Sequence, residues 1–233
     1  MLGKNIYPLL RIIFKMIRKH KFKFKNEHPQ LKSNAIYAVN HSRKFDIPYV
    51  CEVLNRHCCV LVGKQRLKPI DRMFFHINGV IWVDRKDREN RHKSSIVMEK
   101  MLNNGTNIVM FPEATWNIEP SLPMLPLRWG IIDIARNSHR PIVPVVLEYT
   151  DNCCYVSFAE PMYITESDDK KQKIDELRDT MATLRWEIWE QLPHVSRRDI
   201  CGDEWEKEVK RILEEYPEYD YDYEQSCILR KNG

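Results

Sequence analysis

The chain has 233 residues, 43% of them hydrophobic, which suits one large domain with a substantial buried core. Its seven glycines and thirteen prolines exclude a low-complexity chain. The formal net charge of +4 conceals an uneven distribution, because the two ends of the chain carry opposite charge.

Residues 1–25 form a basic, amphipathic segment. They contain six Lys and two Arg and no acidic residue. Apolar residues recur at helical spacing between positions 6 and 17, and no uncharged run approaches the ~20 residues that cross a bilayer. We expect a short amphipathic helix on an anionic membrane surface, where each basic residue contributes about 1 kcal/mol. The alternatives are a helix that packs its apolar face on the domain and a segment that binds nucleic acid.

Residues 26–200 alternate between strand-like and helical patterns. Helical spacing is clearest at 91–103, which ends in Asn-Asn-Gly, and at 174–188. The alternation predicts an α/β domain with a mostly parallel mixed sheet flanked by helices. The strand-like runs are at 35–40, 58–63, 79–84, 107–111, 142–148 and 153–158.

Residues 201–233 form an acidic end. From Asp203 to Glu224 there are ten acidic residues against three basic ones. A helix over 203–215 followed by a frayed tail is the simplest interpretation.

The seven cysteines include two adjacent pairs and show no C-x-x-C spacing. This pattern predicts reduced, mostly buried thiols in a cytosolic protein. A zinc site is the alternative, but no metal spacing supports it.

A histidine and an aspartate with four residues between them follow the apolar run 35–39. The stretch Asn40-His41-Ser42-Arg43-Lys44-Phe45-Asp46 is typical of a strand that delivers His41 to a sheet edge, with a helix opening behind it. If residues from 43 onward are helical, the Asp46 carboxylate can point back toward His41. We expect Ser42 to be the helix N-cap and not a nucleophile, because no Gly-x-Ser-x-Gly elbow surrounds it.

Three more blocks follow in order along the chain. Gly79-Val80-Ile81-Trp82-Val83-Asp84-Arg85 ends in an arginine, Phe111-Pro112-Glu113-Ala114-Thr115 is a strand end running into a polar turn, and Pro141-Ile142-Val143-Pro144-Val145 is strand-like. With the His-(four residues)-Asp stretch, these blocks resemble the glycerolipid acyltransferase family of lysophosphatidic acid acyltransferases. The resemblance covers roughly residues 35–150, and four ordered blocks are far more specific than one.

The resemblance implies transfer of a fatty acyl chain from acyl-CoA or acyl carrier protein to the hydroxyl of 1-acylglycerol 3-phosphate or a related lysophospholipid. Neither a metal nor a bound cofactor is implied. His41 would be the general base, because imidazole titrates near neutral pH, and Asp46 would fix its tautomer. The family assigns the arginine that matches Arg85 to the acceptor phosphate; an ion pair with Asp87 or Glu89 is the alternative. The remaining substrate-binding candidates are Glu113, Thr115, Arg128 and Asn40.

Three residues depart from the family pattern. Ala114 stands where the family has glycine, so a backbone with positive φ would be strained there. Trp116 replaces an arginine that commonly follows the threonine, and Ser42 directly follows His41 where the family serine comes two places after. We expect these departures to affect the acceptor site more than the reaction.

We therefore expect an enzyme of phospholipid biosynthesis, peripheral on the cytoplasmic face of the cell membrane and without a nucleic-acid partner. Its partners would be the acyl thioester donor, which is acyl-CoA or acyl carrier protein, together with the acceptor and the anionic lipid surface. Two other classes stay open. One is a lipid-binding module of the same fold without turnover; the other is a nucleic-acid-binding protein that uses the basic end.

Overall fold

The computed structural model describes residues 2–43, 45–64, 69–117, 122–150, 152–193, 197–199, 202–215 and 222. The elements of this part of the chain are α1 (Leu2–Ile17), β1 (Lys21–Phe24), β2 (Ile36–Val39), α2 (Asp46–Val53), β3 (Cys58–Gly63), α3 (Pro69–Asn78), β4 (Val80–Val83), α4 (Arg88–Asn103), β5 (Asn107–Met110), α5 (Gly130–Ser138), β6 (Ile142–Tyr149), β7 (Cys153–Phe158), α6 (Lys170–Trp189), a short 3-10 turn (Arg197–Asp199) and α7 (Glu204–Glu215).

The seven strands form one sheet in the order β1-β7-β6-β2-β5-β3-β4. Strands β2 to β6 run parallel, β7 pairs antiparallel with β6, and β1 pairs parallel with β7. The mostly parallel mixed sheet and all six expected strands are thus confirmed.

The strand β1 was not expected. Its sequence Lys-Phe-Lys-Phe alternates charged and apolar side chains, as an edge strand does. These residues lie in the basic segment 1–25 that we expect on a membrane surface, and the structure shows that they also pair with β7. The expected helices are confirmed as α4, α6 and α7; the expected tail, apart from residue 222, lies outside the described residues.

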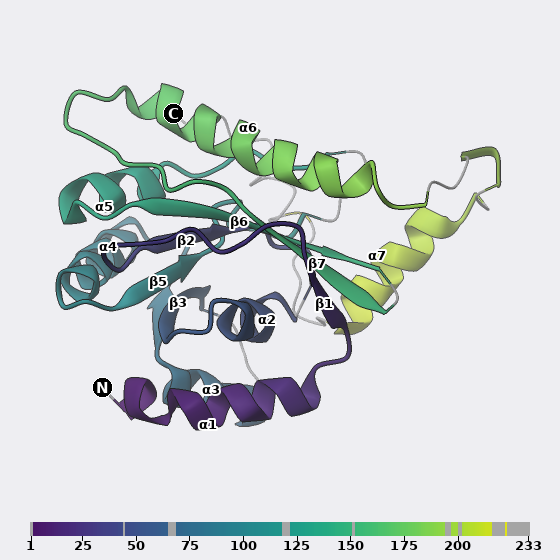
Figure 1. The fold of residues 1–233 in the computed structure, drawn as a ribbon, viewed down its shortest axis with the longest axis horizontal. Helices are drawn as coiled ribbons and strands as arrows, with labels where there is room; N and C mark the ends of the chain where they lie inside the picture. The colour runs from purple at the N-terminus through teal and green to yellow at the C-terminus, as the bar shows by residue number, and fades with distance from the viewer. Residues whose placement is uncertain are drawn as a thin grey trace.

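Helices cover both faces of the sheet (Figure 1). On β2, Tyr37 and Val39 face the core shared with α1, α2 and α3, whereas Ile36 and Ala38 face the core shared with α4, α5 and α6. In Figure 1, α1 and α3 lie side by side below the sheet with α2 between α1 and the strands, and α6 runs along the opposite face. Apolar runs buried on both sides are what a sheet covered on two faces requires.

The helix α1 carries two apolar stripes. Tyr7, Leu10 and Phe14 are buried on the domain, so the packing alternative was correct for this stripe. The second stripe repeats at i, i+3, i+4, i+7 and i+8 and stays exposed. It consists of Leu9, Ile12, Ile13, Met16 and Ile17.

The topology brings the sequence blocks to one edge of the sheet. His41 follows β2, Arg85 follows β4, Glu113 follows β5, and Tyr149 ends β6. Because these strands are parallel, their carboxyl ends meet at the same edge, which is the usual position of a site in an α/β sheet.

Candidate active site

His41 and Asp46 are paired. The imidazole Nδ1 of His41 lies 2.8 Å from Oδ2 of Asp46. The His41 side chain is 17% exposed and the Asp46 side chain is fully buried. A carboxylate only accepts hydrogen bonds, so the neutral imidazole carries its proton on Nδ1 and keeps the lone pair on Nε2. This is the tautomer that a general base needs.

Asp46 organises the loop that carries His41. Its Oδ2 also accepts hydrogen bonds from the backbone N–H groups of Ser42, at 2.7 Å, and Arg43, at 2.9 Å. The helix α2 begins at Asp46 and its N-cap residue is Phe45, so the expectation that Ser42 caps this helix was wrong. The carboxylate of Asp46, in the first turn of α2, reaches back to these N–H groups, so the loop needs no cap from the Ser42 side chain.

Two aromatic rings flank the imidazole. The ring of Phe111 stacks on His41 with 4.3 Å between centroids and an interplanar angle of 29°, and Trp116 lies 5.1 Å away. Trp116 therefore occupies space beside the imidazole that would act as the base. Lys44 lies outside the described residues.

Glu113 braces the same loop from β5. Its Oε2 accepts the backbone N–H of His41 at 2.9 Å and its Oε1 accepts the backbone N–H of Leu125 at 2.9 Å. Burial raises the pKa of Glu113 to about 7, although these two N–H groups and the charge of Arg185 act in the opposite direction. Glu113 is 1% exposed, so its carboxylate supports the backbone of the site.

Arg85 reaches the turn after β5. Its Nη1 donates to the carbonyl oxygen of Ala114 at 2.5 Å. A Cβ at Gly63 would lie 3.3 Å from Arg85 Nε, so the glycine at the end of β3 leaves room for the guanidinium. Ala114 itself has φ of +57°, which confirms that this position needs a left-handed backbone. Thr115 is 2% exposed, and within the described residues its hydroxyl has no hydrogen-bond partner.

Arg128 and Asn40 are held by backbone contacts. The N–H of Arg128 donates to Pro112 O at 2.8 Å, which ties its segment to the Phe-Pro-Glu turn. Asn40 is fully buried. Its Nδ2 donates to Leu147 O at 2.9 Å and its Oδ1 accepts Leu147 N at 2.8 Å. The Asn40 amide therefore continues the pairing of β2 with β6 for one more residue.

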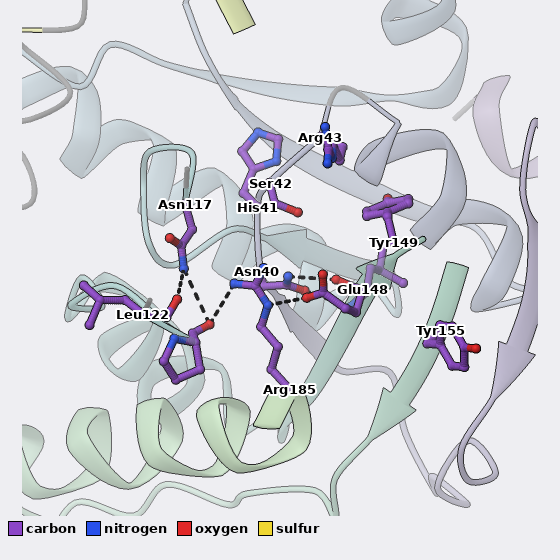
Figure 2. A network of polar contacts seen from close by, with 12 residues as sticks. Asn40, His41, Ser42, Arg43, Asn117, Leu122, Glu148, Tyr149, Tyr155 and Arg185 are labelled. Carbon is purple, nitrogen blue, oxygen red and sulfur yellow. Dashed lines mark hydrogen bonds and ion pairs between the residues drawn. The ribbon is translucent and has the colours of Figure 1, made fainter. Parts of the chain in front are cut away.

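A buried asparagine links the His41 loop to the segment before α5. Asn117 N donates to His41 O at 2.6 Å, and its side-chain Nδ2 donates to Leu122 O at 3.0 Å. Figure 2 shows this asparagine beside the His41 loop, above the helix α6.

Arg185 of α6 extends the network from the other side. Its Nη1 donates to Pro123 O at 2.9 Å and its Nε is paired with Glu148 near the end of β6 (Figure 2). Arg185 is 7% exposed. Through this bond, α6 contacts the segment that Asn117 connects to His41, although α6 lies more than a hundred residues after His41 in the chain.

Sequence reasoning missed Tyr149, Asn117 and Arg185. The hydroxyl of Tyr149 donates to Oδ1 of Asp46 at 2.5 Å. Tyr149 could have been found, because it is the polar residue that ends a strand at the active edge. Arg185 gives no such signal, since a single arginine on an amphipathic helix is usually solvated.

The described cysteines are free thiols, and Cys51, Cys58, Cys59 and Cys154 are buried. Among the residues that the structure covers, no three His, Cys, Asp or Glu side chains gather as metal ligands would. In the same part of the chain, no helix has both the length and the apolar character that crossing a bilayer takes.

Comparison with known proteins identifies related chains. Residues 21–148 match the family model described as Acyltransferase. The 1-acyl-sn-glycerol-3-phosphate acyltransferase alpha of Ovis aries is 28% identical over 169 residues, which are 66% of this chain and 58% of that protein. The 1-acyl-sn-glycerol-3-phosphate acyltransferase of Saccharomyces cerevisiae is 27% identical over 195 residues, 76% of this chain and 63% of that protein. The chain spans about three-fifths of the length of these curated relatives.

A solved structure has the same fold. The crystal structure of the 1-acyl-sn-glycerophosphate (LPA) acyltransferase PlsC from Thermotoga maritima aligns with a TM-score of 0.64 at 16% sequence identity. The alignment covers 82% of this chain and 81% of that chain. The predicted fold is therefore confirmed.

Proposed function

Because the chain belongs to the acyltransferase family, we propose that it transfers a fatty acyl chain from acyl-CoA or acyl carrier protein to the hydroxyl of 1-acylglycerol 3-phosphate or a related lysophospholipid. The observation that carries this proposal is the contact of 2.8 Å between His41 Nδ1 and the buried Asp46 carboxylate. The step would belong to phospholipid biosynthesis.

The proposed reaction needs no covalent acyl-enzyme. The acceptor hydroxyl attacks the thioester carbonyl while His41 Nε2 takes its proton, so a C–O bond forms and an oxyanion develops. Collapse of this intermediate breaks the C–S bond, and the thiolate that leaves receives the proton from the imidazolium. The Asp46 carboxylate stabilises the imidazolium between these two steps.

In this proposal Arg85 binds the acceptor phosphate, and Arg128 assists in binding it. Both residues are attached to the turn after β5, Arg85 through Ala114 O and Arg128 through Pro112 O. The same turn holds the His41 backbone through Glu113. A guanidinium suits phosphate because its planar fork can meet two oxygens at once.

The exposed stripe of α1 supports peripheral binding to the cytoplasmic face of a membrane. Leu9 and Ile12 are each 58% exposed and Met16 is 79% exposed. Lys19, Lys21, Lys23 and Lys25 follow this helix directly. An apolar stripe with basic residues beside it suits an anionic lipid surface.

Vesicle flotation tests the membrane part of the proposal. The double variant Ile12→Glu with Met16→Glu should lose binding to vesicles that contain phosphatidylglycerol. The matched control is Ile96→Glu with Val97→Glu on α4, which places the same charges on residues that are 50% and 46% exposed elsewhere. Equal flotation of both double variants, or preference for duplex DNA over vesicles, would contradict the proposal.

An acceptor screen tests the reaction. Labelled oleoyl-CoA and oleoyl acyl carrier protein are each offered with lysophosphatidic acid, glycerol 3-phosphate or lysophosphatidylcholine, and thiol release and acylated product are measured. His41→Ala should lower kcat by about 10²–10⁴-fold, whereas His92→Ala on the exposed side of α4 should not.

The same screen separates acceptor recognition from chemistry. Arg85→Ala should raise KM for a phosphate-bearing acceptor by about 10–100-fold, with Arg88→Ala as the exposed control. Binding of lipid with neither thiol release nor product, across all donors and acceptors, would reject the enzyme and favour a non-catalytic lipid-binding module.

A further inference from the structure

The Asp46 carboxylate has one more hydrogen-bond partner besides His41 and the backbone of the loop. The hydroxyl of Tyr149, at the end of β6, donates to Asp46 Oδ1 at 2.5 Å, on the carboxylate oxygen that does not face His41. Burial and the neighbouring Asp46 charge raise the pKa of Tyr149 well above its ordinary value. The phenol therefore stays protonated and acts as the donor.

We propose that Tyr149 is a positioning residue of the acyltransferase site, which fixes Asp46 and sets how tightly His41 holds its proton. The inference rests on the proposed function, because it assigns a role within that reaction. It adds a residue that lies one position past the end of the segment that the family model matches, residues 21–148.

Electrostatics gives the direction of the effect. The phenol O–H draws part of the Asp46 negative charge toward Oδ1, and this part is not available to an imidazolium at Oδ2. Without the phenol donor, Asp46 attracts a protonated His41 more strongly. The imidazole would then stay protonated to higher pH, and less of it would be free to act as base near neutral pH.

Two other parts of the chain, the connection between α1 and β1 and the helix α2, hold the phenol in place. The His20 ring, between α1 and β1, packs edge-on against Tyr149 with 5.5 Å between centroids, and Tyr49 of α2 lies 5.9 Å away. The Nδ1 of His20 and the hydroxyl of Tyr49 are 2.8 Å apart, which joins these two neighbours. A hydroxyl fixed in this way needs little reorganisation during turnover.

Few of the surrounding groups change charge near neutral pH. Burial, with Arg43 and Lys19, lowers the pKa of His20, and burial raises the pKa of the Cys154 thiol far above neutrality. Glu113, whose pKa is about 7, does titrate in this range. Within the described residues, the titratable and charged groups near the His41, Asp46 and Tyr149 cluster include His20, Tyr49, Cys154, Arg43 and Glu113.

The pH dependence of kcat/KM, with oleoyl-CoA and lysophosphatidic acid, tests the inference. Tyr149→Phe should move the acidic limb up by about one pH unit and lower kcat/KM by up to about tenfold on that limb, with KM for the acceptor nearly unchanged. The control is Tyr37→Phe, which removes a buried hydroxyl bonded to His28 and should leave the profile in place. The comparison is repeated in Glu113→Gln protein, so that titration of Glu113 does not contribute.

Proton NMR of the full chain tests the inference without turnover. The titration midpoint of the His41 imidazole, assigned from the signal lost in His41→Gln, should rise by about one pH unit in Tyr149→Phe. In the unmodified chain, the Tyr149 hydroxyl should give a slowly exchanging proton signal, so a variant that does not fold still leaves a measurement.

The outcomes separate the two levels of the proposal. Absence of product with every donor and acceptor overturns the function, whatever His41 does. An unchanged His41 midpoint in Tyr149→Phe, or a hydroxyl proton of Tyr149 that exchanges as fast as that of an exposed tyrosine, overturns the positioning role while the enzyme stays active.

Discussion

Replacing Ala114 with glycine should stabilise this chain, although glycine usually destabilises proteins. Ala114 has φ of +57°, a conformation that costs an L-residue about 1–2 kcal/mol. Glycine removes this strain but gives the unfolded chain more freedom, which takes back about 0.4–1 kcal/mol. The free energy of unfolding should therefore rise by about 0.5–1 kcal/mol, which is about 2 °C in Tm for a chain of this size.

Urea unfolding followed by circular dichroism measures this difference. The matched control is Ala182→Gly in the middle of α6, where the same change should cost about 1 kcal/mol because the backbone is helical. The reasoning is refuted if Ala114→Gly loses as much stability as Ala182→Gly. That result would mean that the turn after β5 holds its left-handed residue without strain.

Three further predictions concern buried polar groups. Burial raises the pKa of Glu113 in the folded chain from 4.5 to about 7, so its stabilising contribution is complete below pH 4.5 and is lost as the pH rises through 7. Between these limits, the free energy of unfolding of the unmodified chain should fall by about 3 kcal/mol relative to that of Glu113→Gln. Arg185→Met should lower the free energy of unfolding by about 3 kcal/mol, and adding Glu148→Met should restore at least half of it, because the unpaired buried charge is then gone. Asn40→Ala should cost about 3 kcal/mol in thermal unfolding and change stability more than KM, since two backbone groups of Leu147 lose their partners. Failure of the second substitution to restore stability, or a large rise in KM with unchanged Tm for Asn40→Ala, would contradict these assignments.

The architecture and the central pair could be predicted because they depend on local patterns. Apolar runs of strand length define β2 to β7, and two of these runs are followed within three residues by His41 and Glu113. Parallel strands bring such ends together without further information. The left-handed turn at Ala114 was also predictable, because glycine is the usual residue where φ is positive.

The supporting contacts could not be predicted in the same way. The bond from Tyr149 to Asp46 joins residues 103 apart in sequence, and the bond from Arg185 to Pro123 joins residues 62 apart. Such contacts depend on which strands are neighbours and on where α6 crosses the sheet. The contact of Asn40 with β6 also required the structure, because the pairing of its amide with the backbone of Leu147 cannot be read from the sequence.

The pairing of β1 with β7 has a consequence for biosynthesis. Lys21 lies opposite Cys153, so the first strand of the chain waits for about 130 further residues to be made before its neighbour exists. At 5–20 residues per second this delay is roughly 7 to 26 s. During that interval the strand has unpaired backbone groups that could recruit another nascent chain. Its alternating lysines repel such a copy, so their charge protects the unpaired strand from aggregation while the protein is being translated.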